Sequence, residues 1–286
     1  MKTVFWGRVG APDSHERLEG VLFEFYRTSA WRTRRAPFGF KLLPSRMETE
    51  EEKVMAKKPT RTQIMQRKKR IDQLLKSAYS PDKDHLSDFP HFRHYNTTGL
   101  SLSLESGRGD KLSSNLKQYI QKLLKVNMEG PYGAEWPAEE KVKRKEMSSP
   151  EALYIFVHKV ASTPDHAEAS IIGFVQYRFT IEEEIPVLYV YELQLEPTYQ
   201  GKGVGKFLMQ LVELIACKNC MGAVVLTVQK RNSSAINFYL NKLRYNVSSI
   251  SPSKVYQLIG VIGHEKSYEI LCKTFDHEAK AVLEES

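Results

Sequence analysis

Five segments rich in β-branched and aromatic residues follow Pro150, and two helical segments interrupt them. The five segments read ALYIFVHKV, SIIGFVQYRFT, VLYVYELQL, AVVLTVQ and SYEILCKTF. The helical segments cover residues 206–219 and 233–242. Such composition is typical of strands. Helices first, then strands around two helices, predict an α/β fold in which helices flank a mostly antiparallel sheet.

The part of the chain before Pro150 is predicted to be mainly helical. A basic helix is expected over 60–78, and an amphipathic helix over 113–128 with Ser113 or Ser114 as its cap. Between them, SLSLES alternates like a strand until GRGDK breaks it. A loop, NMEGPYGAEW, is expected next, and PAEEKVKRKEM restarts a helix with Pro137 in its first turn.

The chain of 286 residues is expected to form one main domain. We assign 1–54 to a poorly ordered extension, 55–79 to a basic helical segment packing on the domain, 80–276 to the domain itself and 277–286 to a flexible tail. The sequence contains no run of about 18 uncharged apolar residues, so we expect a soluble protein. Three cysteines are too few for a disulfide framework, and CKNC has no second metal-binding pair nearby, so no metal site is predicted.

Positive charge is concentrated in one segment of this chain, which has a formal net charge of +8. Residues 57–76 contain a single acid, Asp72. This segment is compatible with contact to nucleic acid or chromatin, and with a nuclear import signal at RKKR. A solvated helix face explains the same pattern equally well.

The glycine-rich run QGKGVG lies between a predicted strand and a predicted helix. A phosphate loop of the ATPase type would need one more residue before its lysine and a hydroxyl where Phe207 stands. A dinucleotide fingerprint would need G-x-G-x-x-G, whereas this run has G-x-G-x-G. Its backbone N–H groups and the helix N-terminus can still bind a pyrophosphate, with Lys202 and Lys206 adding positive charge.

The spacing that remains, Q-x-x-G-x-G, resembles the acetyl-coenzyme-A loop of the GCN5-related N-acetyltransferase superfamily. Downstream, LTVQKRNSSAINFYLNKLRY resembles the second signature of the superfamily, although a core aromatic would explain its tyrosine as well. The resemblance implies the fold of this superfamily with an extra N-terminal basic helix. It also implies two splayed strands that receive the pantetheine arm, and acetyl-CoA as cosubstrate. The cofactor-binding residues that it implies are Leu193, Gln194, Leu195, Gln200, Gly201, Lys202, Gly203, Val204, Gly205, Lys206, Asn232 and Tyr239.

Acyl transfer to an amine needs a base and donors for the oxygen that becomes negative. Glu192, on the strand before the loop, is the leading candidate base, and the N–H groups that follow it are candidate oxyanion donors. Tyr189 and Tyr191 can orient the amine or return a proton to the leaving thiolate. A regular strand places both tyrosines on one face and Glu192 on the other, whereas a β-bulge would bring them together.

Further motifs resemble the N-alpha-acetyltransferase D family, which acetylates the N-terminal amine of histone four and histone two-A. They are FPHFRHYNTTGLSLSLE, VNMEGPYGAEW, VLYVYELQLEPTYQGKGVGKFL and SYEIL. The resemblance implies tails beginning Ser-Gly-Arg-Gly as substrates. The substrate-binding residues that it implies are Tyr132 and Trp136 at the peptide entrance, Thr180, Glu182 and Tyr189 near the reaction centre, and Tyr268 on the far wall.

This chain departs from that family at Thr180, where the family has an aspartate. Glu182 is expected to supply the missing carboxylate and is the second candidate base. Glu183 and Glu184 are more simply explained as a solvated acidic turn. A longer run before Tyr268, KVYQLIGVIGHEK, is a second departure.

The sequence thus predicts an acetyl-CoA-dependent protein N-alpha-acetyltransferase that transfers the acetyl group directly in a ternary complex. A lysine side-chain acetyltransferase and a non-catalytic chromatin-binding module are the alternatives. Histone tails, and nucleosomes or nascent histones at the ribosome, are the expected partners. We expect a monomer in the nucleus and cytoplasm, without membrane association.

Overall fold

The structure is a computed structural model that describes residues 60–160, 170–258 and 266–285. The predicted extension at 1–54 lies outside the described residues, as does most of the long run before Tyr268. By its internal contacts the chain divides into two units, and the second, Thr62–Ser286, contains the sheet and the site. No helix in the described part is both long and apolar enough to cross a bilayer.

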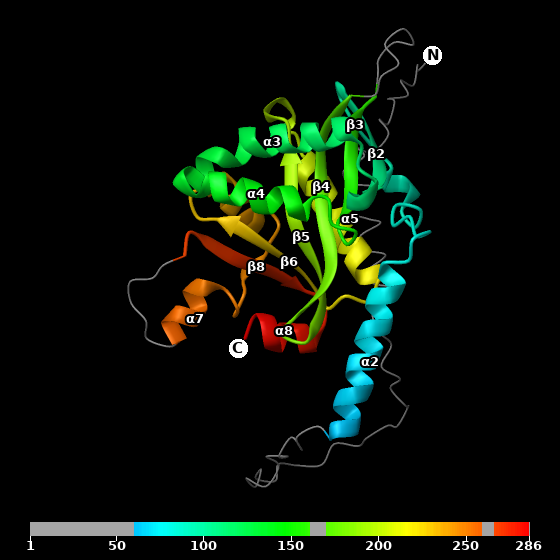
Figure 1. The fold of residues 1–286 in the computed structure, drawn as a ribbon, viewed down its shortest axis with the longest axis vertical. Coiled ribbons are helices and arrows are strands. Elements are labelled where there is room, and N and C mark those ends of the chain that lie inside the picture. The colour runs from blue at the N-terminus through cyan, green and yellow to red at the C-terminus, as the bar shows by residue number, and fades with distance from the viewer. Residues whose placement is uncertain (1–59, 161–169, 259–265, 286) are drawn as a thin grey trace, which may run out of the picture. The chain divides into compact units, whose positions relative to one another are not determined.

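A single twisted sheet forms the centre of the second unit (Figure 1). Its eight described strands lie in the order β1-β2-β3-β4-β5-β6-β8-β7. All neighbouring pairs are antiparallel except β5 and β6, which are parallel. The mostly antiparallel sheet that the sequence predicts is therefore confirmed. The strands are β1 (His94–Thr97), β2 (Leu100–Arg108), β3 (Leu153–Lys159), β4 (Ile171–Glu182), β5 (Ile185–Leu195), β6 (Ala223–Gln229), β7 (Asn246–Val247) and β8 (Tyr268–Thr274).

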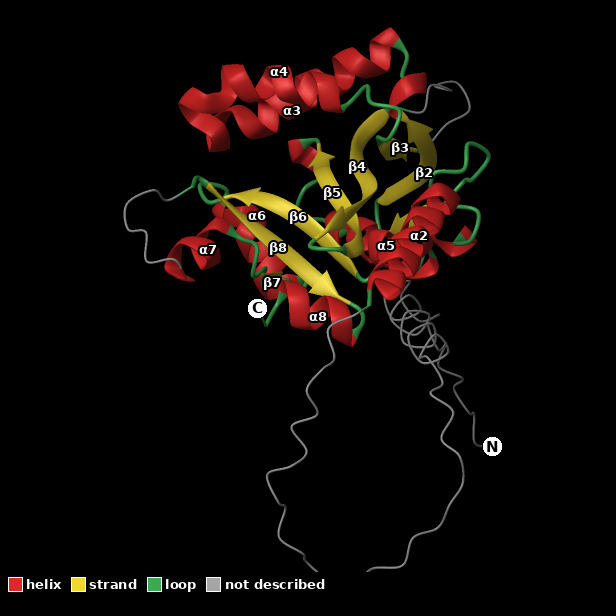
Figure 2. Cartoon of the chain, turned by 60° about the horizontal axis from the view of Figure 1, so that its bottom comes forward, coloured by secondary structure: helices red, strands yellow, loops and turns green. Residues whose placement is uncertain are grey.

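Helices cover both faces of the sheet (Figure 2). On one face lie α3 (Ser114–Tyr132) and α4 (Trp136–Glu146), which pack on aromatic side chains of β3 and β4. α8 (His277–Leu283) packs on the same face, against Val187, Val225 and Cys272. α5 (Val204–Lys218) covers the other face, where Glu213 accepts a hydrogen bond from Lys273 of β8 at 2.8 Å. The remaining helices are α2 (Arg61–Ala78), α6 (Ser233–Asn237), a π-helical turn (Phe238–Lys242), α7 (Pro252–Leu258) and 3-10 turns at 90–92, 109–111, 133–135 and 197–199.

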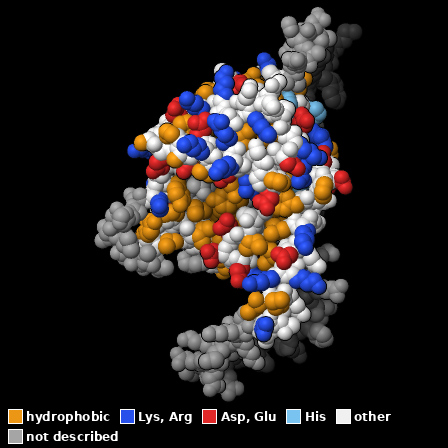
Figure 3. All heavy atoms as spheres, in the orientation of Figure 1, with side chains coloured by type: hydrophobic (Ala, Val, Ile, Leu, Met, Phe, Trp, Pro, Cys, Tyr) orange, Lys and Arg blue, Asp and Glu red, His pale blue; other side chains and the backbone are white. Residues whose placement is uncertain are grey.

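The two helices that cover the cavity side of the sheet follow their predicted starts. Ser113 caps α3, and its side chain accepts a hydrogen bond from the backbone N–H of Leu116 at 3.2 Å. α4 begins at Trp136 with a proline in its first turn, where a missing N–H costs nothing. Lysines and arginines are spread over the outer surface of this helical layer (Figure 3).

The predicted loop NMEGPYGAEW is wrong. Instead, α3 continues through Pro131 to Tyr132, and a 3-10 turn leads directly into α4. Gly133 ends α3 with φ of +57°, a value that favours glycine. The rings of Tyr132 and Trp136 pack 5.9 Å apart in the apolar layer between helix and sheet. Burial of this aromatic surface explains why the segment is helical despite its glycines and proline.

Tyr79, just after α2, and Arg67, within α2, connect this segment to the rest of the unit. Tyr79 accepts a hydrogen bond from the Phe179 N–H and donates one to the Phe179 carbonyl, each at 2.9 Å. Arg67 forms an ion pair with Glu278 of α8 and donates to the Glu184 carbonyl at 3.2 Å. The remaining basic residues of RKKR are exposed.

Candidate active site

A β-bulge in β5 sets the directions of the predicted catalytic side chains. Across β4, Tyr177 pairs with Val190 and Gln176 pairs with Glu192, so Tyr191 is the extra residue of β5. Paired residues share a face of the sheet, so the bulge turns Glu192 to the face that Tyr189 already occupies. Tyr189, Tyr191 and Glu192 therefore line one cavity, and the bulge that was needed to bring them together is present.

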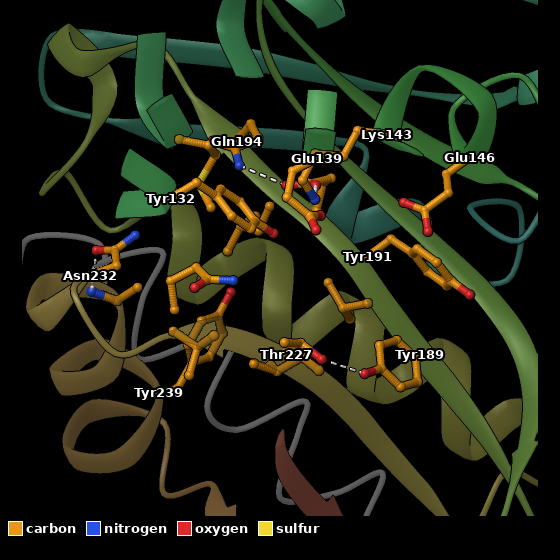
Figure 4. Close-up of a pocket in the computed structure, with 18 of the residues that line it drawn as sticks. Tyr132, Glu139, Lys143, Glu146, Tyr189, Tyr191, Gln194, Thr227, Asn232 and Tyr239 are labelled. Carbon is orange, nitrogen blue, oxygen red and sulfur yellow. Dashed lines mark hydrogen bonds and ion pairs between the residues drawn. The ribbon is translucent and has the colours of Figure 1, made fainter. Parts of the chain in front are cut away.

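The cavity opens where β5 and β6 separate. In the described ladder, only residues Val187–Val190 of β5 pair with residues Ala223–Leu226 of β6. Beyond this ladder, the ends of both strands, Tyr191–Gln194 and Thr227–Gln229, line a cavity of about 400 Å³. Its other walls come from α3, α4 and the α6 region (Figure 4). Such a gap leaves backbone groups of β5 available to a ligand, as the resemblance to acetyltransferases implies.

The glycine loop lies between β5 and the start of α5 and has the geometry of an anion-binding turn. Gly201 and Gly203 have φ of +73° and +84°, and Gly203 is the N-cap of α5. A Cβ on Gly203 would lie 2.7 Å from the hydroxyl of Tyr95, which donates to the Lys202 carbonyl at 2.8 Å. Gln200 ties the loop back to β5 by donating to the Leu195 carbonyl at 3.0 Å. The loop thus presents backbone and a helix N-terminus where phosphates can bind.

Glu192 is buried, with 6% of its side chain exposed, and both its carboxylate oxygens have partners. Oε1 pairs with the Lys143 ammonium of α4. Oε2 accepts a hydrogen bond from Gln194 Nε2 at 2.8 Å. Burial opposes the charge on Lys143, but the Glu192 carboxylate outweighs this effect and raises the pKa of Lys143. The candidate base is therefore held as one partner of a buried ion pair.

The two tyrosines that flank Glu192 in sequence are held by different partners. The Tyr189 hydroxyl lies 2.6 Å from Thr227 Oγ1, across the gap between the strands (Figure 4). Burial raises the pKa of Tyr189 to about 12, so the phenol is neutral at physiological pH. The guanidinium of Arg178 stacks 4.4 Å from the ring centre of Tyr191. Burial also raises the pKa of Tyr191, with Arg178 opposing it.

Asn232 and Tyr239 lie on the opposite wall, as expected for cofactor-contacting residues. The Asn232 side chain caps α6 by accepting from the Ala235 N–H at 3.1 Å. Tyr239 lies in the π-helical turn, a wide turn that often marks functional sites. Its ring is 8% exposed, and burial raises its pKa.

The acidic residues at the end of β4 lie in two different places, the cavity wall and the turn to β5. Glu182 lines the cavity, and burial followed by the charge of Glu183 raises its pKa. Thr180 lies on the same face of β4, opposite Val187, but is not part of the cavity wall. Glu183 and Glu184 are exposed and form the β4–β5 turn with φ of +45° and +64°. This arrangement agrees with their interpretation as a solvated turn.

Several predicted site residues do not line the cavity. Trp136 is 3% exposed and packs in the core, so its prediction as an exposed entrance residue is wrong. Tyr268 starts β8, half-buried and paired with Gln229. Leu195 and the loop residues 200–206 also lie outside the cavity wall described above. Tyr132, Leu193 and Gln194 do line it.

Several cavity residues on α4 and β6 are not predicted by the sequence. Glu139, Lys143 and Glu146 occur in a helix whose sequence looks like a solvated charged face, so no local signal marks them. Thr227 is the one polar residue inside the otherwise apolar first part of β6, and this exception could have marked it. Among the described residues, no group of three or more potential metal ligands is found.

The gap between two parallel strands and the glycine-rich helix start agree with the resemblance to acetyltransferases. Residues 118–243 match the family profile described as "Acetyltransferase (GNAT) family". This part of the chain is an acetyl-CoA-dependent acetyltransferase domain, hence an acyltransferase. The matched region contains most of α3 and all of α4, the bulge, the glycine loop and the π-helical turn.

Solved structures with a similar chain path include PaiA N-acetyltransferase of Thermoplasma acidophilum in complex with coenzyme A. It is 20% identical with a TM-score of 0.41, over 60% of this chain and 99% of that chain. Arabidopsis thaliana NAA60 in complex with a bisubstrate analogue is 13% identical with a TM-score of 0.43, over 61% and 100% of the two chains. Arabidopsis thaliana Naa50 in complex with the bisubstrate analogue CoA-Ac-MVNAL is 18% identical with a TM-score of 0.38, over 61% and 99%.

Proposed function

We propose that this protein is an N-alpha-acetyltransferase that acetylates the N-terminal amine of histone four and histone two-A tails beginning Ser-Gly-Arg-Gly. The observation that carries the proposal is the joint presence of Tyr132, Tyr189, Tyr191 and Glu192 around one cavity. These are the residues that the resemblance to the histone N-terminal acetyltransferases assigns to the reaction centre and the peptide entrance. They come from α3 and from both sides of the bulge in β5.

The charge of the cavity supports a cationic substrate. Four carboxylates line it, and Lys143 is the one cationic side chain among the described lining residues. A tail that carries an α-ammonium group and an arginine at its third position would complement this charge. Glu182 and Glu146 can receive the arginine. Burial raises the pKa of each carboxyl, and a bound guanidinium would offset this effect by favouring the ionised form. The carboxylates are Glu139, Glu146, Glu182 and Glu192.

Acetyl-CoA supplies the acetyl group as an activated thioester. The side chains of this chain have three tasks: to orient the peptide amine, to accept its proton and to exclude water. Glu192 accepts the proton, directly or through one water, and the neutral Tyr189 and Tyr191 hydroxyls orient the amine. No cysteine is among the described residues of the cavity wall, which supports direct transfer in a ternary complex without an acetyl-enzyme.

Mass spectrometry of a Ser-Gly-Arg-Gly-Lys peptide incubated with acetyl-CoA tests the proposal. The wild-type protein should add one acetyl group to the α-amine, and the same peptide with a blocked N-terminus should remain unmodified. Glu192→Gln should lower kcat by a factor of about 10² to 10⁴, the usual contribution of an acid–base group. Acetylation of the blocked peptide alone would instead identify a lysine side-chain acetyltransferase.

We further propose nucleosomes or nascent histones at the ribosome as partners, and the nucleus and cytoplasm as locations. The exposed basic residues of α2 support this proposal. Changing Lys68, Lys69 and Arg70 to glutamine should reduce the nuclear fraction of a fluorescent fusion without changing activity on the free peptide. An unchanged nuclear fraction would refute a role of this segment in import.

A further inference from the structure

The Lys143–Glu192 pair is unusual because both of its side chains are largely removed from water. The side chain of Lys143 is 12% exposed and that of Glu192 is 6% exposed. Lys143 lies on α4, whereas Glu192 lies just after the bulge of β5, so the pair connects the helical layer to the reaction centre. A buried ion pair is costly to form, and breaking it by removing one partner leaves an uncompensated charge.

A chain of hydrogen bonds fixes the other side of the same carboxylate. Glu192 Oε2 accepts from Gln194 Nε2 at 2.8 Å, and Gln194 Oε1 accepts from Asn127 Nδ2 at 2.9 Å. Asn127 belongs to α3 and also donates to the Leu195 carbonyl at 3.0 Å. Figure 4 shows Gln194 and Lys143 on the same wall of the cavity. The carboxylate is thus held from α4 on one side and from its own strand on the other.

Of the two partners of the Glu192 carboxylate, Lys143 is charged and Gln194 is neutral. Its Nζ also lies 5.4 Å from the ring centre of Tyr132, which keeps the ammonium beside the peptide entrance. Arg178 acts on the neighbouring Glu146 and Tyr191 from the side of β4. The other titratable groups that face Lys143 or Glu192 are Glu146 of α4, Tyr132 of α3, Tyr154 of β3 and Tyr239 of the π-helical turn.

We propose that Lys143 is a positioning residue that keeps Glu192 ionised and aimed at the acceptor amine. The inference rests on the proposed role of Glu192 as the base. When the peptide binds, an N–H bond of its α-ammonium group breaks and the proton passes to a Glu192 oxygen. A neutral amine and a neutral carboxylic acid then lie beside the ammonium of Lys143. That ammonium favours the ionised form of Glu192, so it also favours release of the proton before the next turnover.

The dependence of kcat/KM on pH separates this role from a structural one. Lys143 supplies the positive charge in contact with the carboxylate, so Lys143→Met should move the acid limb of the profile upward. Activity of this variant should recover at alkaline pH. Lys143→Arg keeps the charge and should keep the limb near its wild-type position. Lys141→Met removes an exposed lysine two residues earlier on α4 and is the matched control.

Ionisation of Glu192 can also be followed without any peptide. Carboxylate infrared difference spectra of the full chain, with Glu192→Gln as the blank, give the titration midpoint of this one group. The midpoint should rise in Lys143→Met and remain unchanged in Lys141→Met. If Lys143→Met fails to fold by circular dichroism, Lys143→Gln replaces it, because its amide can still donate to Glu192 without a charge.

The outcomes distinguish this inference from the proposed function. A midpoint that rises in the neutral variant, with no acetylation of the peptide by wild-type protein, would retain the role of Lys143 and refute the N-terminal substrate. Peptide acetylation with an unchanged midpoint would refute the role of Lys143 alone. A loss of kcat/KM by the same factor at every pH would likewise show that the lysine serves only to hold the fold.

Discussion

Gly203→Ala should damage the glycine loop more than Gly201→Ala, although both glycines have positive φ. At Gly201, where φ is +73°, no atom lies within 4 Å of the position of a new Cβ. At Gly203, where φ is +84°, the Cβ would lie 2.7 Å from the Tyr95 hydroxyl. The two substitutions therefore share the backbone strain, and only the second also displaces Tyr95.

The difference between the two substitutions can be worked out from these contacts. A left-handed conformation costs an L-residue about 1–2 kcal/mol, which applies to both positions. Moving the Tyr95 hydroxyl breaks its hydrogen bond to the Lys202 carbonyl, which adds roughly 0.5–1.5 kcal/mol for Gly203→Ala. The loss of unfolded-state entropy on replacing glycine is the same at both positions and cancels in the comparison.

Urea unfolding of the two variants, each with and without Tyr95→Phe, measures this term as a double-mutant cycle. In the Tyr95→Phe background the hydroxyl is absent, so Gly203→Ala and Gly201→Ala should cost the same free energy of unfolding. Calorimetric titration with CoA should show the weaker binding for Gly203→Ala, because this residue sets the first backbone N–H groups of α5. Equal costs in the Tyr95 background would refute the reasoning.

Three further predictions concern the cavity and the opposite side of the sheet. Burial lowers the pKa of His85 to about 4, so the folded protein holds this ring neutral and loses stability as pH falls below 6.5 toward that value. Urea unfolding should therefore give roughly 2–3 kcal/mol less stability at pH 4.5 than at pH 7 from this group, and His85→Gln should reduce the difference. Tyr189→Phe removes the contact to Thr227 and should lower kcat/KM about 2–10-fold. The pH profile of kcat/KM should keep all its limbs below pH 10 in place, and a shifted limb would refute the neutral state of the phenol. Glu182→Gln should raise the KM for the basic tail about tenfold, as expected for a lost charged hydrogen bond, whereas Thr180→Asp should change it less, and the reverse order would place the tail over Thr180.

The sequence predicted those parts of the fold that local patterns determine. Ser113 caps its helix, Gly201 and Gly203 precede α5, and the segments after Pro150 form strands, because each of these depends on residues close together in sequence. The loop before Trp136 was predicted from glycine and proline alone. Burial of Tyr132 and Trp136 on the sheet decides the conformation there, and burial is a property of the folded chain.

The candidate site was predictable except for the wall that α4 contributes and the part of β6 that carries Thr227. Tyr189, Tyr191 and Glu192 are recognisable in sequence because they lie beside the glycine loop. Lys143 is not, since a lysine in a charged helix usually faces water and nothing local indicates a partner in β5. The bulge was only partly predictable. The sequence allowed it as a hypothesis, and the pairing of β4 with β5 establishes it.

The bulge also determines how this strand tolerates changes in length. Downstream of Tyr191, the side chains alternate out of phase with the period that starts at Ile185. Deleting Tyr191 would therefore restore a regular ladder and leave Glu192 paired with Gln176, so that Glu192 and Gln194 would keep their sheet surface. An alignment without a gap at Tyr191, against a relative whose strand is regular, would pair the wrong side chains with the reaction centre. Comparisons of catalytic residues among relatives should thus be anchored after the bulge, where the position of Glu192 is fixed by its pairing with Gln176.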